Sequence, residues 1–289
     1  MSNARAITFL PNRTDARRGL TIYFVVLLAG SIFFDWKIIQ TGKSVDQVPL
    51  LILGLMYTPA LSSVIARFCL REGFTDVSFR SGGSESIRVL WLVWAYPMIV
   101  GAVTYGIAWL TGLAQFQLPL PAQSHLYSES PSSNLLASLF VSATLGTAVS
   151  CVATFGEELG WRGYMLTRMI AAGMPTPILV SGIIWALWHV PIILSGQYAS
   201  GAHPRLSAVL FVIGVVAESY LVGYVRLRSG SVWPAVTMHG AWNALIQGTF
   251  DRATVGTPFA VGESGWLSVI VSVGFVIMVT RRKKWISTG

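Results

Sequence analysis

The sequence predicts an all-α, polytopic membrane protein: a bundle of about eight transmembrane helices with both termini in the cytoplasm. Hydrophobic residues make up 53% of the 289 residues and charged residues only 11%, against about 25% charged in an ordinary soluble domain. Apolar stretches of about 20 residues, the length that crosses a bilayer, recur along the chain. The basic residues gather on alternate connections between these stretches, as the positive-inside rule requires.

The same composition excludes several other classes of protein. A disordered chain would be rich in charge and poor in apolar residues. A disulfide scaffold is excluded because the chain has only two cysteines, Cys69 and Cys151, and both lie in apolar stretches. The net charge of +8 would suggest nucleic acid for a soluble protein. Here the charges flank apolar segments, so we expect lipid surroundings and no nucleic-acid partner.

Eight segments are long and apolar enough to be candidate spans. The first follows a basic tail and has no small-residue cleavage site after it, so we interpret it as a retained span. We expect a tail at 1–19, one membrane domain at 20–280 with its core at about 135–250, and a basic tail at 281–289. The spans are predicted at 20–36, 49–69, 89–113, 135–156, 174–195, 206–225, 231–248 and 265–280.

Charge distribution tests this count of spans. With a cytoplasmic N-terminus, 16 of the 20 lysines and arginines fall in the tails and connections on the cytoplasmic side. A missed or invented span would destroy this asymmetry. The connection 114–134 is the longest; it is rich in serine and proline and has Glu129 as its single charge. The four basic residues on the outer side are Lys37, Lys43, Arg205 and Arg252.

Ionisable residues inside the spans indicate function, because they are costly to bury in lipid. Glu157 and Glu158 are predicted at the cytoplasmic end of the fourth span, and their side chains point about 100° apart on a helix. Arg162 follows Glu158 by four residues, on the same face. The alternative interpretation is a cluster of charges at a helix end that faces water.

Two further spans carry polar groups, each with a structural alternative. His189 lies among aromatic residues in the fifth span, where a lone histidine is often a hydrogen-bonded structural residue. His239 and Asn243 lie four apart in the seventh span and share a face; here the alternative is hydrogen bonding between helices. Glu218 in the sixth span either lines the same cavity or pairs with an arginine or histidine, and we assign it no chemistry.

Together these groups predict a hydrolytic site. So many polar groups are tolerated in lipid if they meet around a water-filled cavity. A carboxylate can take a proton from water. An imidazole can hold that water or relay its proton, and an imidazole with an amide can donate hydrogen bonds to a developing oxyanion.

The three segments resemble the motifs of the CPBP family, the membrane proteins that include CAAX proteases and bacteriocin-processing proteins and are also called the Abi family. The family pattern is Glu-Glu-x-x-x-Arg, then Phe-x-x-x-His, then His-x-x-x-Asn or Asp. The resemblance covers about residues 157–243. Trp185 stands where phenylalanine is usual, and we expect it to pack the site. The matching residues are Glu157, Glu158, Arg162, His189, His239 and Asn243.

The resemblance implies an intramembrane endopeptidase, since eukaryotic relatives remove the last three residues of prenylated CAAX proteins. By this likeness Glu157 is the general base that activates water with His189. His239 and Asn243 hold the oxyanion. Glu158 and Arg162 pair and set the position of Glu157. The expected substrate is a membrane-associated, lipidated or precursor peptide that reaches Glu157 from the cytoplasm. We expect an integral membrane protein of a prokaryotic plasma membrane.

Three alternatives stay open at this point. Two histidines and a glutamate also resemble a catalytic zinc set, in which His189, His239 and Glu157 would be the ligands, although no H-E-x-x-H segment is present; we favour a metal-independent glutamate mechanism. A non-catalytic immunity or scaffold protein would keep the cavity without turnover. A small transporter would use the same cavity for transport, but no inverted repeat or paired broken helices are evident.

Overall fold

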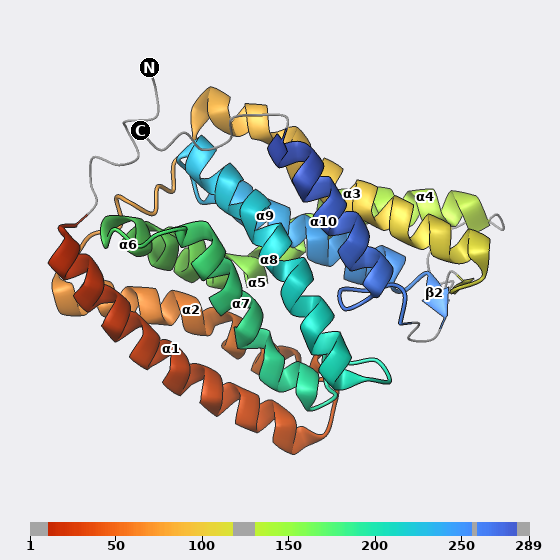
Figure 1. Ribbon diagram of the computed structural model, residues 1–289, viewed down its shortest axis with the longest axis horizontal. Coiled ribbons are helices and arrows are strands. Elements are labelled where there is room, and N and C mark those ends of the chain that lie inside the picture. Colours follow the sequence, from red (N-terminus) through yellow and green to blue (C-terminus); the bar gives the residue numbers. More distant parts are fainter. Residues whose placement is uncertain (1–10, 118–130, 256–258, 282–289) are drawn as a thin grey trace.

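The computed structural model describes residues 11–117, 131–255 and 259–281, and helices make up most of them. Most of the predicted 114–134 connection and large parts of both predicted tails lie outside these ranges. In Figure 1, α5 lies at the centre of the bundle with the other helices around it. The all-α class predicted from composition is confirmed.

The helical segments follow the predicted spans in order. Several consecutive helices run on without a break, from α4 to α6 and from α9 into η4. One short antiparallel pair, β1 with β2, is added at an end of the bundle. The elements are α1 (Arg13–Thr41), η1 (Val45–Gln47), α2 (Pro49–Leu70), α3 (Gly83–Thr111), β1 (Gln115–Phe116), α4 (Pro131–Val141), η2 (Ser142–Gly146), α5 (Thr147–Gly160), η3 (Trp161–Met165), α6 (Leu166–Ala171), α7 (Pro177–Leu194), α8 (Pro204–Ser229), α9 (Trp233–Trp242), η4 (Asn243–Phe250), β2 (Thr254–Val255) and α10 (Trp266–Arg281).

Six helices in the described ranges are long and apolar enough to cross a membrane: α1, α2, α3, α7, α8 and the continuous helix at Ser133–Ala171. The helix α10 is apolar but shorter. The predicted number of eight spans therefore remains a prediction, whereas the integral membrane class is supported.

The fourth predicted span differs from the structure at its C-terminal end. We expected it to end at 156, with Glu157, Glu158 and Arg162 at its cytoplasmic end, and water-facing charges were the alternative. Instead the helix continues to Ala171, roughly four more turns beyond Glu157. All three side chains are at most 2% exposed. The water-facing interpretation is therefore wrong: hydropathy ended the span too early because these charges are buried inside the bundle.

Glycines allow the helix that carries Glu157 to approach its neighbours closely. A Cβ at Gly160 of α5 would lie 2.4 Å from the carbonyl carbon of Pro59 in α2. On the other side, a Cβ at Gly240 of α9 would lie 3.2 Å from the backbone nitrogen of Cys151 in α5. Small residues at such crossings are the usual means of close packing in membrane bundles. The depth of Glu157 in the bundle is thus set by contacts at Gly160 and Gly240.

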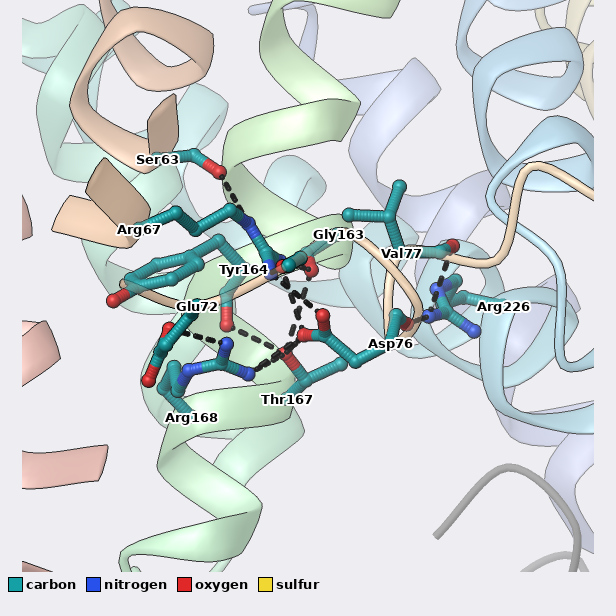
Figure 2. Close-up of polar contacts among 11 residues, drawn as sticks. Ser63, Arg67, Glu72, Asp76, Val77, Gly163, Tyr164, Thr167, Arg168 and Arg226 are labelled. Atoms are coloured by element: carbon teal, nitrogen blue, oxygen red, sulfur yellow. Dashed lines mark hydrogen bonds and ion pairs between the residues drawn. The ribbon is translucent and has the colours of Figure 1, made fainter. Parts of the chain in front are cut away.

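A buried ion cluster joins three helices to the connection between α2 and α3 (Figure 2). We call it the Asp76 cluster. The Asp76 carboxylate pairs with Arg67 of α2 and with Arg168 of α6, each at 2.6 Å. Arg168 also contacts Glu72 at 2.7 Å. Arg226 of α8 donates to the Asp76 carbonyl oxygen at 2.6 Å. One loop residue, through its carboxylate and its main-chain carbonyl, therefore fixes the ends of three helices.

The surroundings of Asp76 change its acidity. Burial alone would raise the pKa of this carboxyl. The hydrogen bonds and charges of Arg67 and Arg168 outweigh burial, so the pKa lies below its ordinary value of 3.8. No short motif indicates this cluster, because its members are scattered between positions 67 and 226.

We expect Gly160→Ala to destabilise the protein in detergent, because the added methyl group meets the backbone of α2. Overpacking of this kind costs about 1–3 kcal/mol, which a thermal unfolding scan would detect as a lower Tm. Gly274→Ala is the matched control, since a Cβ at that position in α10 meets nothing within 4 Å. Equal Tm values for the two variants would contradict the close contact at Gly160.

We expect Asp76→Ala to cost about 3–5 kcal/mol, because it leaves buried arginines unpaired. Asp15→Ala is the control; its exposed pair with Arg18 is worth about 0–1 kcal/mol. A lowered pKa means that the Asp76 contribution is present above pH 3.8 and is lost as the pH falls towards the lowered pKa. Tm measured from pH 7 to pH 3 should therefore fall more steeply on the acid side in the wild type than in Asp76→Ala. Parallel curves would contradict the pairing.

Candidate active site

Three of the helices bring the motif residues to one cavity of about 240 Å³. Glu157 comes from α5, His189 from α7, and His239 and Asn243 from α9 and the start of η4. Glu158 and Arg162 do not line this cavity; they lie behind it, fully buried. The six residues named by the motifs thus divide into four that face the cavity and two that support them.

Two indole groups hold the carboxylate of Glu157. Trp185 of α7 donates from Nε1 to Oε2 at 2.8 Å, and Trp161 donates to the same oxygen at 3.3 Å. Both donors are neutral, so they orient the carboxylate without cancelling its charge. Trp185 was expected only to pack the site; its hydrogen bond to Glu157 is a second contribution, which phenylalanine could not make.

His189 is oriented by its own helix. Its Nδ1 lies 2.9 Å from the carbonyl oxygen of Trp185. A carbonyl oxygen only accepts, so Nδ1 carries the proton and, in the neutral ring, Nε2 keeps a lone pair. The rings of Trp188 and Phe211 pack against the imidazole. This lone pair can accept a hydrogen bond from water.

Glu158 supports His239. Its Oε1 accepts hydrogen bonds from Nδ1 of His239 at 3.0 Å and from Arg162 at 2.8 Å. We expected the pair of Glu158 and Arg162 to position Glu157, but the direct partner of Glu158 across the bundle is His239. The pairing itself is as expected from the spacing of four residues.

Arg162 influences Glu157 through an aromatic ring. Its guanidinium lies 4.1 Å from the ring centre of Trp185, the residue whose indole binds Glu157. It also contacts Ser219 Oγ of α8 at 3.4 Å. Stacking of a cation on a desolvated indole is favourable by up to about 2 kcal/mol. Arg162 therefore fixes the Trp185 side chain while it pairs with Glu158.

Two π-helical segments, whose turns are wider than those of an α-helix, begin at or next to motif residues. The π-helical segment η3 starts at Trp161, directly after the two glutamates, and η4 starts at Asn243. Such turns are frequent at functional sites because they change the direction of side chains along a helix. Within the described residues, Nδ2 of Asn243 has no hydrogen-bond partner, and its Oδ1 accepts weakly from Gln247 at 3.5 Å. The amide therefore has free donors facing the cavity.

The cavity opens at the end of the bundle opposite the Asp76 cluster. Its rim includes Asp46 from the connection after α1, Tyr198 from the connection after α7, and Glu263 from the segment before α10. On the other side of the motif, Trp161 and Arg162 are fully buried. In Figure 1 the connections after α1 and α7 lie at the lower end, away from the start of α1 and the end of α10. The more exposed lining residues therefore lie at the end of the bundle away from the termini, and approach of the substrate from the cytoplasm stays a prediction.

Several residues around the cavity were not identified from the sequence. Glu263 accepts from Trp242 Nε1 at 2.8 Å and from the Tyr198 hydroxyl in a short hydrogen bond. Glu218, which we had left without a role, lines the cavity as well, and its Oε1 is buried with no partner in the described ranges. These residues lie outside the short motifs, so only the folded chain brings them to the site.

The zinc alternative concerns three of the residues that line the cavity. Among the described residues, no three histidine, cysteine or acidic side chains come close enough to hold a metal ion. The Nδ1 atoms of both histidines are engaged by Trp185 and Glu158, which leaves each Nε2 for the cavity, as is also usual for histidines that bind a metal. The zinc site of His189, His239 and Glu157 stays a prediction, and the proposed reaction assigns no step to a metal.

The fold and this cavity define an integral membrane protein with a buried polar site suited to hydrolysis. A family model, the type II CAAX prenyl endopeptidase Rce1-like family, matches residues 133–245. The match spans all three motifs and supports the resemblance to the CAAX protease family that the motifs predicted. No match was found among curated proteins.

We expect Trp185→Phe to lower kcat by about tenfold to a hundredfold with little change in KM. The ring still packs, but a hydrogen bond to a charged group, worth about 1.5–3 kcal/mol, is lost. Trp94→Phe is the matched control, because its indole donates to the Ala143 carbonyl oxygen and its side chain does not line the cavity. If Trp185→Phe and wild type had equal kcat, the indole would have no part in positioning Glu157.

Proposed function

We propose that the protein is an intramembrane endopeptidase that cleaves a membrane-associated, lipidated or precursor peptide with water activated by Glu157. One observation carries the proposal: an oriented carboxylate shares a cavity inside a helix bundle with two imidazoles and a free amide. The family match supports a CAAX-type protease. We place the protein in the plasma membrane of a prokaryote.

In the proposed reaction, Glu157 takes a proton from water as the water oxygen attacks the carbonyl carbon of the peptide bond. His189 Nε2 accepts a hydrogen bond from the same water and orients it. The carbonyl oxygen becomes negative as its bond to carbon becomes single. Collapse of this intermediate breaks the carbon–nitrogen bond, and Glu157 returns the proton to the leaving nitrogen.

The oxyanion is assigned to the other two motif residues. Asn243 donates from Nδ2. His239 donates from Nε2 when it carries protons on both nitrogens, and the Nδ1 contact with Glu158 favours that form because a carboxylate stabilises a cation beside it. Donors in place before the reaction need no reorganisation, which is the main advantage of such a site.

We expect Glu157→Gln, which keeps the size of the side chain, to lower kcat by about 10²–10⁴-fold. His189→Ala and His239→Ala should also abolish turnover, with the bundle still inserted and folded. The assay uses purified protein in liposomes with a fluorogenic prenylated CAAX peptide and a set of unprenylated membrane-anchored peptides. Unimpaired cleavage by any of the three variants would remove that residue from the catalytic set.

Two controls make this assay decisive. Asp15→Asn changes an exposed acid far from the cavity and should keep wild-type turnover. A strong chelator, followed by washing and zinc readdition, reports on metal dependence separately from the variants. If wild type cleaved no peptide of either set, the result would favour the non-catalytic immunity or scaffold protein.

A further inference from the structure

The cavity is acidic well beyond what catalysis uses. Besides Glu157 and the histidines, its ionisable lining residues are Asp46, Glu218 and Glu263. Among the residues that the structure describes, no lysine or arginine lines it. None of these three carboxylates forms an ion pair within the described ranges. The catalytic proposal accounts for Glu157 and leaves the other three carboxylates unexplained.

Glu263 is held in place at the rim by neutral donors. Its two oxygens accept separately from the Trp242 indole and the Tyr198 hydroxyl. Tyr198 in turn stacks on the His189 ring, with the ring centres 6.1 Å apart. The carboxylate is therefore connected to the His189 ring through Tyr198, and it forms no ion pair with the protein cations described.

The buried carboxyl group of Glu218 is a second, independent feature that points to a ligand. This side chain is 4% exposed, lines the cavity from α8, and has a buried Oε1 without any partner in the described part of the chain. A buried carboxyl without partners is costly, and such groups call for a specific explanation. Glu218 and Glu263 also line one small neighbouring chamber of about 10 Å³ together with Trp242, so the two carboxyl groups lie in the same region.

We propose that this region is a subsite for a basic side chain of the peptide substrate, a lysine or arginine next to the bond that is cleaved. The inference rests on the proposed endopeptidase function and names its substrate class. Glu263 and Glu218 supply the negative charge, and Tyr198 and Trp242 add aromatic groups, which cations favour, to the lining of the same cavity. The same charges would repel a substrate that presents its C-terminal carboxylate here.

The test compares membrane-anchored fluorogenic peptides that are identical except at one position. Within each set of three peptides, that position is lysine, norleucine or glutamate. Separate sets place it at each of the three residues on either side of the cleaved bond. We expect wild type to cleave one lysine peptide at least about tenfold more efficiently, by kcat/KM, than its norleucine counterpart, with the glutamate peptide poorest. Absence of any lysine preference would overturn the subsite while the endopeptidase function stands.

Variants locate the preference. Glu263→Gln should reduce the lysine-to-norleucine ratio at least about tenfold; its amide oxygen can still accept from Trp242, and its NH2 group can donate to the Tyr198 hydroxyl oxygen. Glu218→Gln should lower the same ratio. Glu263→Lys should invert the preference towards the glutamate peptide. Asp15→Asn should change neither ratio nor rate. A purely structural role would lower cleavage of all three peptides equally, which would overturn the proposal.

Binding separates this proposal from the catalytic one. The same three peptides, with N-methylated backbone amides that resist cleavage, are titrated into the protein and followed by tryptophan fluorescence. Tighter binding of the lysine peptide, weakened in Glu263→Gln, would support the subsite. If wild type bound this peptide in that way but cleaved none of the peptides, only the endopeptidase proposal would fail. Equal binding of all three peptides would overturn the subsite.

Discussion

The two hydrogen bonds accepted by one oxygen of Glu158 are the interaction on which the site depends. They join Arg162 and His239, and so connect two helices that are 81 positions apart in the chain at their point of contact. A carboxylate this deeply buried is tolerated only when charged or polar donors satisfy it. Removal of either donor would leave the negative charge of Glu158 incompletely compensated inside the bundle. The first and third motifs are thus one electrostatic unit.

The second motif joins this unit through Trp185. Its indole binds Glu157 by its edge and Arg162 by its face, and its backbone carbonyl orients His189. One residue therefore positions the proposed base, the supporting arginine and the imidazole. This explains how a bundle of apolar helices can hold several polar groups in fixed positions: few of them contact each other directly, and a buried aromatic residue connects the rest.

Composition and spacing predicted the helical class, the order of the spans and the four residues that line the cavity. Hydropathy could not show that the helix with Glu157 continues to Ala171, because a hydropathy scale scores a buried, paired charge in the same way as an exposed one. The roles of Asp76 and Glu263 could not be predicted from the sequence, for a different reason. Their partners lie far away in the sequence, and no short motif marks them.

Buried arginines and the carboxylates of the cavity rim lie at opposite ends of the bundle. Arginines that the positive-inside rule counts as cytoplasmic, such as Arg67 and Arg226, are in fact buried around Asp76, so part of the orientation signal is also structural. The cavity opens at the other end, where its rim carries Asp46 and Glu263. A basic peptide segment is attracted to that rim, while the arginine cluster closes the opposite end. The charge distribution that predicts the orientation in the membrane is therefore consistent with substrate entry from the arginine-poor side.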